Sequence, residues 1–425
     1  MDTSKLKKFA QFARRSLIAQ VGAKLDAVLA ENSAARREHP AAMKKLDEAI
    51  AKEGKGQVTE RVAYTWFNRF SALRYMDLND LNPVRVVSPL PGQFQPEILA
   101  EAKAGNIDEA RVPEKTRSQV RALLDGRAPS PDAQGEAYRL LFVATCNDWC
   151  KTMPFLFERI DDYTELLLPE DLLSNASILA SLREAMTPDD CKDVEIIGWL
   201  YQFYISEKKD QVIGKVVKSE DIPAATQLFT PNWIVKYMVQ NTLGAQWLAT
   251  YPNSPLRAQM EYYIEPAEQT DEVKAQLAAI TPSTLNPEEI TLIDPPCGSG
   301  HILVEAYELF KAIYLERGYR QRDVAQLILE KNLFGLDIDP RAAQLAGFAL
   351  MMKGRADDRR LFERGVRHNV MTLVDSAGFD AEALAKGVEL SDYGLKPGDL
   401  TELKQLFEHA TTFGSLIQVP EGLAE

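Results

Sequence analysis

The first half of the chain repeats apolar residues at the spacing of α-helices. The segment LKKFAQFARRSLIAQVGAKLDAVL (6–29) places them three and four residues apart, with charged residues between them. Residues 58–81 predict a strong amphipathic helix with one core-facing stripe. That stripe consists of Val62, Trp66, Phe67, Phe70 and Leu73. The helical pattern returns over 138–205, so this half is predicted to be helical.

The segment 82–137 interrupts the helical pattern. It is rich in Pro, Gly and charged residues and predicts a surface excursion with one short helix near 95–104. Strand signals are nearly absent before residue 285. The sequence therefore predicts a helical N-terminal domain over residues 1–215, followed by a different domain over 216–425.

The pattern changes near residue 285. The short apolar run EEITLIDPP ends in a turn, and the helical pattern SGHILVEAYELFKAIYLERG follows it. A second predicted helix, RDVAQLILEKN, leads into the apolar run LFGLDIDP. A third predicted helix, PRAAQLAGFALMMKGR, leads towards a third strand near 365–375. Strands alternating with helices predict an α/β fold with a parallel, doubly wound (Rossmann-like) sheet.

Length and composition narrow the class of protein. A chain of 425 residues is long enough for two or three domains. Hydrophobic residues make up 45% and charged residues 26%, which is typical of globular proteins. No run of about 18 apolar residues predicts a membrane span. The charged, amphipathic N-terminus is unlike a secretory signal, so the cytoplasm is the expected location.

Charge and cysteine content exclude two further classes. A net charge of −13 argues against a protein that coats nucleic acid without specificity, because phosphate contacts need Lys and Arg. The four cysteines, Cys146, Cys150, Cys191 and Cys297, form no Cys-x-x-Cys pair, and the chain has only four histidines. Reduced, buried thiols are therefore expected, and no metal site is predicted.

The candidate chemistry lies in the turn DPPCGSG (294–300). Gly298 and Gly300 allow a ligand to approach the backbone, and the helix that follows points its first amides at that ligand. Asp337 ends the second apolar run, where an acidic side chain can accept hydrogen bonds from ribose hydroxyls. Together these residues predict a nucleoside-containing cofactor.

The nature of the turn favours S-adenosylmethionine over NAD. The acid follows the glycines by nearly forty residues, where about twenty is usual in dinucleotide sites. The turn also begins with Asp294, a carboxylate that would repel a pyrophosphate and attract an ammonium group. A nicotinamide-dependent dehydrogenase is therefore the weaker alternative.

A second segment accompanies this turn. Phe229-Thr230-Pro231 directly precedes an amphipathic stretch, and Pro at the first helical position after Thr is typical of a capped helix start. Taken alone, this pattern predicts only a helix with Thr230 as its N-cap.

Taken in order, these motifs resemble those of γ-type amino-group DNA methyltransferases. The order is Gln227-x-Phe-Thr-Pro (motif X), then Asp-Pro-Pro-Cys-Gly-Ser-Gly (motif I), then Gly335-x-Asp-x-Asp-Pro (motif II). Within that group the chain is most similar to the adenine-specific methyltransferases of BREX phage-defence systems, the PglX proteins. The segments AYTWFNRFSALRYMD, LFGLDIDPRAAQLA and FGSLIQ carry that likeness.

The resemblance implies a class I methyltransferase domain over 216–425 that binds S-adenosylmethionine. Motif I would border the methionine part, motif X would close over its carboxylate end, and motif II would hold the ribose and flank the adenine. The implied cofactor-binding residues are Phe229, Thr230, Pro231, Asp294, Pro295, Cys297, Gly298, Ser299, Gly300, Asp337 and Ile338.

The resemblance also implies a catalytic loop that this sequence lacks. The family uses Asn/Asp-Pro-Pro-Tyr/Phe to accept the protons of the adenine amino group and to stack on the flipped base. Pro-Pro occurs once in the chain, at 295–296, where Cys297 follows instead of an aromatic residue. We therefore expect an incomplete methyltransferase domain with no catalytic residue: a fragment, a split gene product or a subunit completed by a second polypeptide.

Two functions remain open from the sequence. The first is the N-terminal part of an adenine-N6 DNA methyltransferase that acts in BREX defence on double-stranded DNA, through the complete protein and with other BREX proteins. The second is a non-catalytic module that binds a defence partner or a phage inhibitor. Neither predicts a membrane association.

Overall fold

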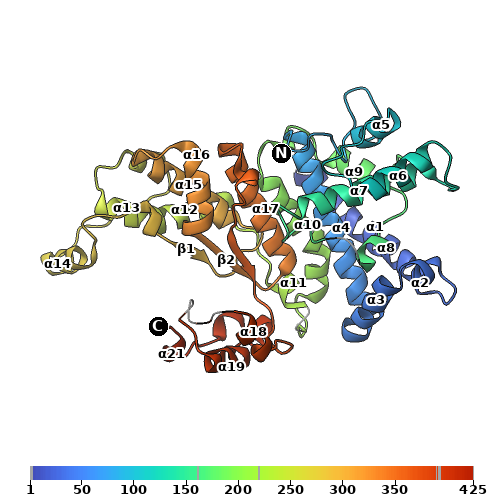
Figure 1. Ribbon diagram of the computed structural model, residues 1–425. Helices are drawn as coiled ribbons and strands as arrows, with labels where there is room; N and C mark the ends of the chain where they lie inside the picture. The colour runs from blue at the N-terminus through green and yellow to red at the C-terminus, as the bar shows by residue number, and fades with distance from the viewer. Residues whose placement is uncertain (1–2, 160–161, 219–220, 389, 391–393, 425) are drawn as a thin grey trace. The chain divides into compact units, whose positions relative to one another are not determined.

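The computed structural model describes residues 3–159, 162–218, 221–388, 390 and 394–424. The chain divides into two compact units, residues 1–207 and residues 208–425, here called unit 1 and unit 2 (Figure 1). The division falls within a helix and lies eight residues before the boundary expected from the sequence. Among the described residues, no helix combines the length and the apolar character needed to cross a membrane.

Unit 1 is helical, as the sequence predicts. Its α-helices are α1 (Thr3–Leu29), α2 (Ala34–Glu38), α3 (Pro40–Glu53), α4 (Lys55–Leu78), α5 (Glu97–Lys103), α6 (Glu114–Leu124), α7 (Ala133–Trp149), α8 (Tyr163–Leu166), α9 (Ile178–Ala185) and α10 (Glu195–Val212), which continues into unit 2. Helix α1 packs on α4 and buries residues spaced three and four apart, among them Ala10, Leu17 and Leu25.

Helix α4 is buried more completely than its apolar stripe indicates. The stripe is buried, and so are Asn68, Arg69, Ser71, Arg74 and Asp77, which the sequence placed outside it. The helix is therefore central to unit 1 and is not a one-sided surface helix. Its polar residues need partners inside the unit, because a buried polar group without a hydrogen bond is destabilising.

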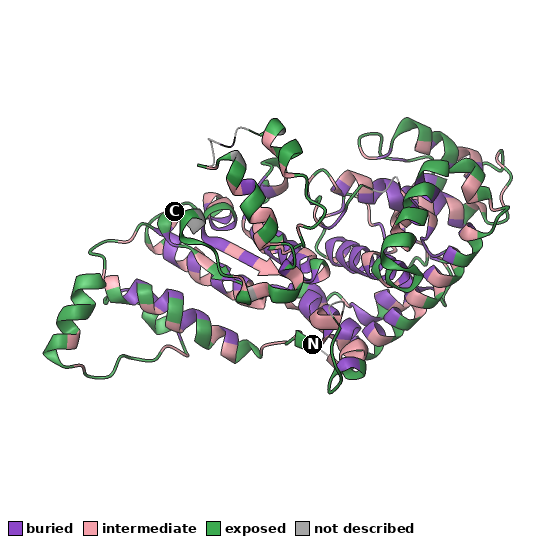
Figure 2. Cartoon of the chain, turned by 90° about the horizontal axis from the view of Figure 1, so that it is seen from below, coloured by how far each residue is buried: buried purple, intermediate pink, exposed green. Residues whose placement is uncertain are grey.

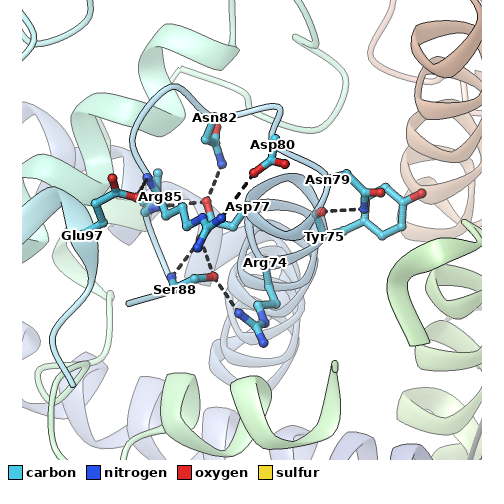
Figure 3. A network of polar contacts seen from close by, with 10 residues as sticks. Arg74, Tyr75, Asp77, Asn79, Asp80, Asn82, Arg85, Ser88 and Glu97 are labelled. Carbon is cyan, nitrogen blue, oxygen red and sulfur yellow. Dashed lines mark hydrogen bonds and ion pairs between the residues drawn. The ribbon is translucent and has the colours of Figure 1, made fainter. Parts of the chain in front are cut away.

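The side chain of Asp77 is fully buried and accepts hydrogen bonds from five donors (Figure 3). Its Oδ1 accepts hydrogen bonds from Asn82 Nδ2 at 2.7 Å and from the amide of Val86 at 2.9 Å. Its Oδ2 accepts from the amides of Val87 and Ser88 and from Ser88 Oγ, each at 2.8 Å. Burial raises the pKa of Asp77, and these donors oppose that rise. The carboxylate thus holds the segment after α4 against the end of that helix.

The segment 82–137 has more regular structure than its Pro and Gly content indicates. It contains α5, which matches the short helix predicted near 95–104, and also α6 and the start of α7. These helices share a small apolar cluster, which includes Ala102, Ile107, Val112, Val120, Leu123, Ala137, Leu141 and Ala144. The expected surface excursion is therefore a packed helical subregion with its own buried residues.

Unit 2 contains a small parallel sheet. Its strands are β1 (Leu292–Asp294), β2 (Leu333–Asp337) and β3 (Asn369–Thr372), in the order β1-β2-β3. Leu292 pairs with Leu333, and Phe334 with Asn369. All three lie where apolar runs predict strands. Because β2 is central, the carboxyl ends of β1 and β2 lie side by side at one edge of the sheet.

Helices connect and cover these strands. The α-helices of unit 2 after α10 are α11 (Ile222–Thr226), α12 (Asn232–Val239), α13 (Ala245–Thr250), α14 (Asp271–Ile280), α15 (His301–Glu316), α16 (Gln321–Leu327), α17 (Pro340–Asp357), α18 (Ala381–Gly387), α19 (Pro397–Leu406), α20 (Ala410–Phe413) and α21 (Glu421–Ala424). Helices α15 and α16 join β1 to β2, α17 joins β2 to β3, and α15 packs on α17 (Figure 1). The three helices predicted after residue 298 are confirmed as α15, α16 and α17.

A candidate cofactor site at the ends of two parallel strands

The turn after β1 is bonded to the turn after β2. The amide of Cys297 donates to the carbonyl of Leu336 at 2.9 Å, which extends the pairing of the two strands past their ends. The amide of Gly298 then donates to Asp337 Oδ2 at 2.8 Å, and the amide of Asp339 donates to Asp337 Oδ1 at 2.7 Å. Asp337 thus ties the two turns together, and motifs almost forty residues apart in sequence form one site.

The two glycines of the turn meet different surroundings. Gly300 has φ +88°, and a Cβ on it would lie 2.9 Å from Ala346 Cβ on α17. It is required both by its left-handed conformation and by the close approach of α17. Gly298 has φ +52°, and a Cβ there would meet no atom within 4 Å. The backbone of Gly298 therefore borders open space, as expected beside a ligand.

Asp294 is a buried carboxylate that has no counterion among the residues that the structure describes. Its side chain lies at the end of β1, and the residue is only 6% exposed. Burial, and secondly the nearby charge of Asp337, raise the pKa of Asp294 to about 6. Among the described residues no hydrogen bond or ion pair offsets that rise.

The other titratable groups of the turn have different environments. Burial raises the pKa of Asp337, and the backbone amides of Asp339 and Gly298 oppose that rise. Burial, followed by the charges of Asp337 and Asp294, raises the pKa of Cys297, so its thiol stays protonated at neutral pH. Cys297 is buried and makes no disulfide, as expected for a structural thiol.

The Phe-Thr-Pro segment also reaches this turn. The ring of Phe229 lies edge-on to that of His301, the first residue of α15, with ring centroids 4.1 Å apart. Helix α12, which follows the segment, packs on α15. The predicted cap is wrong in detail, because α12 begins at Asn232 with Pro231 in the N-cap position and without a side-chain capping bond. Thr230 is therefore not the N-cap, and its hydroxyl is not used in capping this helix.

The remaining predicted residues lie at the same edge with different exposure. Pro295 is exposed, Ser299 is buried, and Ile338 is half-buried beside Asp337. The structure thus brings parts of motifs X, I and II together in unit 2.

Two neighbours of the site, Asp339 and Gly335, were not among the predicted cofactor-binding residues. Asp339 is 1% exposed, caps α17 by accepting from the amide of Arg341 at 3.0 Å, and forms a two-pronged ion pair with that arginine. Gly335 lies under the turn, where a Cβ would meet Leu303 Cδ1 at 2.8 Å. The Asp-Pro start of a helix signals such a cap, whereas the contact at Gly335 has no local sequence signal.

Comparisons with known proteins find that the chain is similar to two adenine-specific methyltransferases. No protein-family model matches it. It is 51% identical over 399 residues to the adenine-specific methyltransferase BrxX of Escherichia coli O9:H4 (strain HS), over 89% of this chain and 32% of that protein. It is 34% identical over 471 aligned residues to the adenine-specific methyltransferase PglX of Lacticaseibacillus casei (strain Zhang), over 98% of this chain and 38% of that protein.

These relatives are much longer than the chain, which spans about a third of their length. The similarity includes nearly the whole chain and is not confined to the glycine turn. The resemblance read from the motifs is therefore confirmed: the chain is a relative of the PglX-like adenine-specific methyltransferases.

Proposed function

We propose that unit 2 binds S-adenosylmethionine and that the chain forms part of an adenine-specific DNA methyltransferase of BREX defence. The observation that carries the proposal is Asp294, a buried carboxylate with no counterion in the described part of the chain, beside a second carboxylate and an open turn. A ligand with a positive charge and a nucleoside fits this arrangement. S-adenosylmethionine has both features, whereas the pyrophosphate of NAD would add negative charge.

Each part of the site has a proposed task. Asp294 accepts hydrogen bonds from the ammonium group, and the backbone of Gly298, Ser299 and Gly300, with Pro295 and Cys297, borders the methionine part. Phe229, Thr230 and Pro231 close over the carboxylate end of the methionine. Asp337 holds the ribose and Ile338 flanks the adenine. Asp337 can serve both its turns and the ribose, because each carboxylate oxygen accepts more than one hydrogen bond.

The bound cofactor would supply a methyl group activated by the neighbouring sulfonium. The residues of this chain orient that cofactor, and none is assigned to the adenine amino group, because the sequence holds no Asn/Asp-Pro-Pro-Tyr/Phe loop. Base flipping and methyl transfer are therefore proposed for a longer polypeptide or an assembled complex. The parallel strands and their connecting helices support a Rossmann-like domain, and the outer edge of β1 offers a place for further strands.

Calorimetric titration with S-adenosylmethionine tests this proposal. We expect saturable binding to the chain, no binding of NAD, and an affinity about ten- to a hundredfold weaker for Asp294→Asn, because a charge-assisted hydrogen bond is lost. Asp271→Asn is the matched control, since it changes the net charge equally at an exposed site on α14. Absence of binding to the unmodified chain, or equal binding to Asp294→Asn, would refute the proposal.

A further inference from the structure

Helix α12 presents an apolar face that the described residues leave exposed. Trp233 is 56% exposed, and Tyr237 and Met238 are 41% and 42% exposed. Trp233 and Tyr237 are four residues apart, so their side chains are neighbours on the helix surface. The opposite face is buried through Val235 and Val239. Two exposed aromatic rings on one helix face form an apolar patch of the kind found at interaction sites.

The position of α12 relates this face to the candidate cofactor site. The helix begins three residues after Phe229, whose ring touches His301 at the start of α15. It then packs along α15, and the two helices lie side by side in Figure 1. A molecule held on α12 would therefore lie on the same helix pair that positions the cofactor turn.

The charge of this region distinguishes it from the rest of the chain. Residues 222–260 contain no Asp or Glu, although the chain has 62 acidic residues in 425 and would on average place roughly six in such a stretch. The only charged residue in α12 is Lys236. Carboxylates repel phosphates, so an aromatic face on a helix without Asp or Glu, in an acidic protein, is compatible with nucleic acid.

We propose that Trp233 and Tyr237 form a stacking surface for an unpaired nucleobase of DNA. Exposed aromatic rings bind bases by stacking, which needs neither a specific sequence nor a deep pocket, and neighbouring positions free of negative charge tolerate the phosphates. The inference rests on the proposed function, because it assumes that DNA is the substrate. It adds a DNA-binding surface that is separate from the cofactor residues.

The test is the binding of a fluorescent single-stranded 20-mer to the chain at about 0.1 M salt, measured by anisotropy. Trp233→Ala and Tyr237→Ala should each weaken binding by about fivefold to a hundredfold, the range expected for one base stacked on one ring. Trp233→Phe keeps a ring and should retain most of the affinity. Phe94→Ala is the matched control, because Phe94 is an aromatic residue of unit 1 that is 89% exposed.

Three results would overturn this inference: no binding of the single strand, undiminished binding by both alanine variants, or equal binding of the blunt duplex of the same sequence. The last two would mean that phosphate contacts or another surface hold the DNA. S-adenosylmethionine titrations of the same variants separate the two proposals. If the unmodified chain binds S-adenosylmethionine but no single strand, the stacking surface alone is refuted, whereas absence of cofactor binding to the unmodified chain would refute the proposed function.

Discussion

At the scale of single residues, Gly298 and Gly300 form a matched pair. Both lie in the left-handed region, but only Gly300 faces another helix closely, with Ala346 Cβ 2.9 Å from the position of a new Cβ. Gly300→Ala should therefore lower the free energy of unfolding by about 2–4 kcal/mol, from backbone strain together with the clash. Gly298→Ala should cost about 1 kcal/mol, from the backbone alone. Urea unfolding measures both.

The two variants should also differ in ligand binding. Gly298 borders open space, so the methyl group added by Gly298→Ala should obstruct the proposed cofactor while the fold is largely retained. Equal losses of stability in the two variants would contradict the close contact between α17 and the turn.

Asp294 predicts a dependence of stability on pH. Its pKa in the folded chain is about 6, raised above the ordinary 3.8 by burial and then by Asp337, so the folded state holds a proton more tightly than the unfolded state. Its ionisation should therefore cost about 3 kcal/mol of stability, lost as pH rises from about 4 to about 7. Asp294→Asn should be more stable than the unmodified chain at pH 7 and similar to it at pH 4.

Cofactor binding should follow the opposite trend. Under the proposed function an ionised Asp294 attracts the ammonium group, so affinity for S-adenosylmethionine should rise as pH increases through 6, and this rise should vanish in Asp294→Asn. Urea unfolding and calorimetry over this pH range check the two trends, with Asp271→Asn as the control for net charge. A pH-independent difference in stability between Asp294→Asn and the unmodified chain would contradict the raised pKa.

At the scale of elements, the sequence correctly predicted the helices and strands that have a local pattern of apolar residues. The sequence analysis correctly predicted α15 and α17 from the spacing of their apolar residues, and the strands from their apolar runs. Burial of one face of an element imposes such a pattern on its sequence. The burial of α4 on all sides was missed, since Arg74 and Asp77 look like solvent-facing residues until their partners in the segment after the helix are known. Polar burial depends on contacts that a local pattern does not contain.

The residues of the candidate site also differ in whether a local sequence signal predicts them. The end of β1, the glycines and Asp337 follow from turn chemistry, whereas the contact of Phe229 with His301 joins residues 72 positions apart and depends on how α12 packs. The helix start near Thr230 was misplaced by one residue, which is within the usual difference between a sequence signature and an observed boundary. The double use of Asp337 by two turns has no sequence signal.

Helix α14 is among the elements that the sequence analysis did not predict. Helix α14 has no buried residue, and Figures 1 and 2 show it at the outer end of a long excursion of unit 2. Hydrogen bonds nevertheless fix the base of the excursion. The side chain of Asn241 makes hydrogen bonds with the backbone of Tyr262 and Ile264, and the hydroxyl of Tyr251 makes them with the backbone of Leu285. Polar side chains thus anchor both ends of a segment that contributes little to the core.

At the scale of the whole molecule, both proposed binding sites lie in one of the two units. Unit 2 contains the candidate cofactor site and α12, and unit 1 contains the buried Asp77 network. Each unit has its own buried core, so two transitions should appear in thermal unfolding. A ligand that binds only the folded form of unit 2 raises the midpoint of that transition.

Asp77→Asn should then act on the other transition. Asparagine keeps the shape of the side chain but offers one acceptor oxygen where the carboxylate offers two, and its amide group would face the donors of Val87 and Ser88. Leaving such buried groups unpaired should cost about 2–5 kcal/mol. Asp80→Asn is the control, because Asp80 lies three residues later with its side chain 84% exposed.

Differential scanning calorimetry with and without S-adenosylmethionine separates these effects. We expect Asp77→Asn to lower one midpoint, the ligand to raise the other, and Asp80→Asn to change neither by more than about two degrees, since exposed substitutions shift stability by about 0.5 kcal/mol or less. A single transition that responds to both changes would mean that the units unfold together. Helix α10, which runs across the division between them, would then be the first element to examine for that coupling.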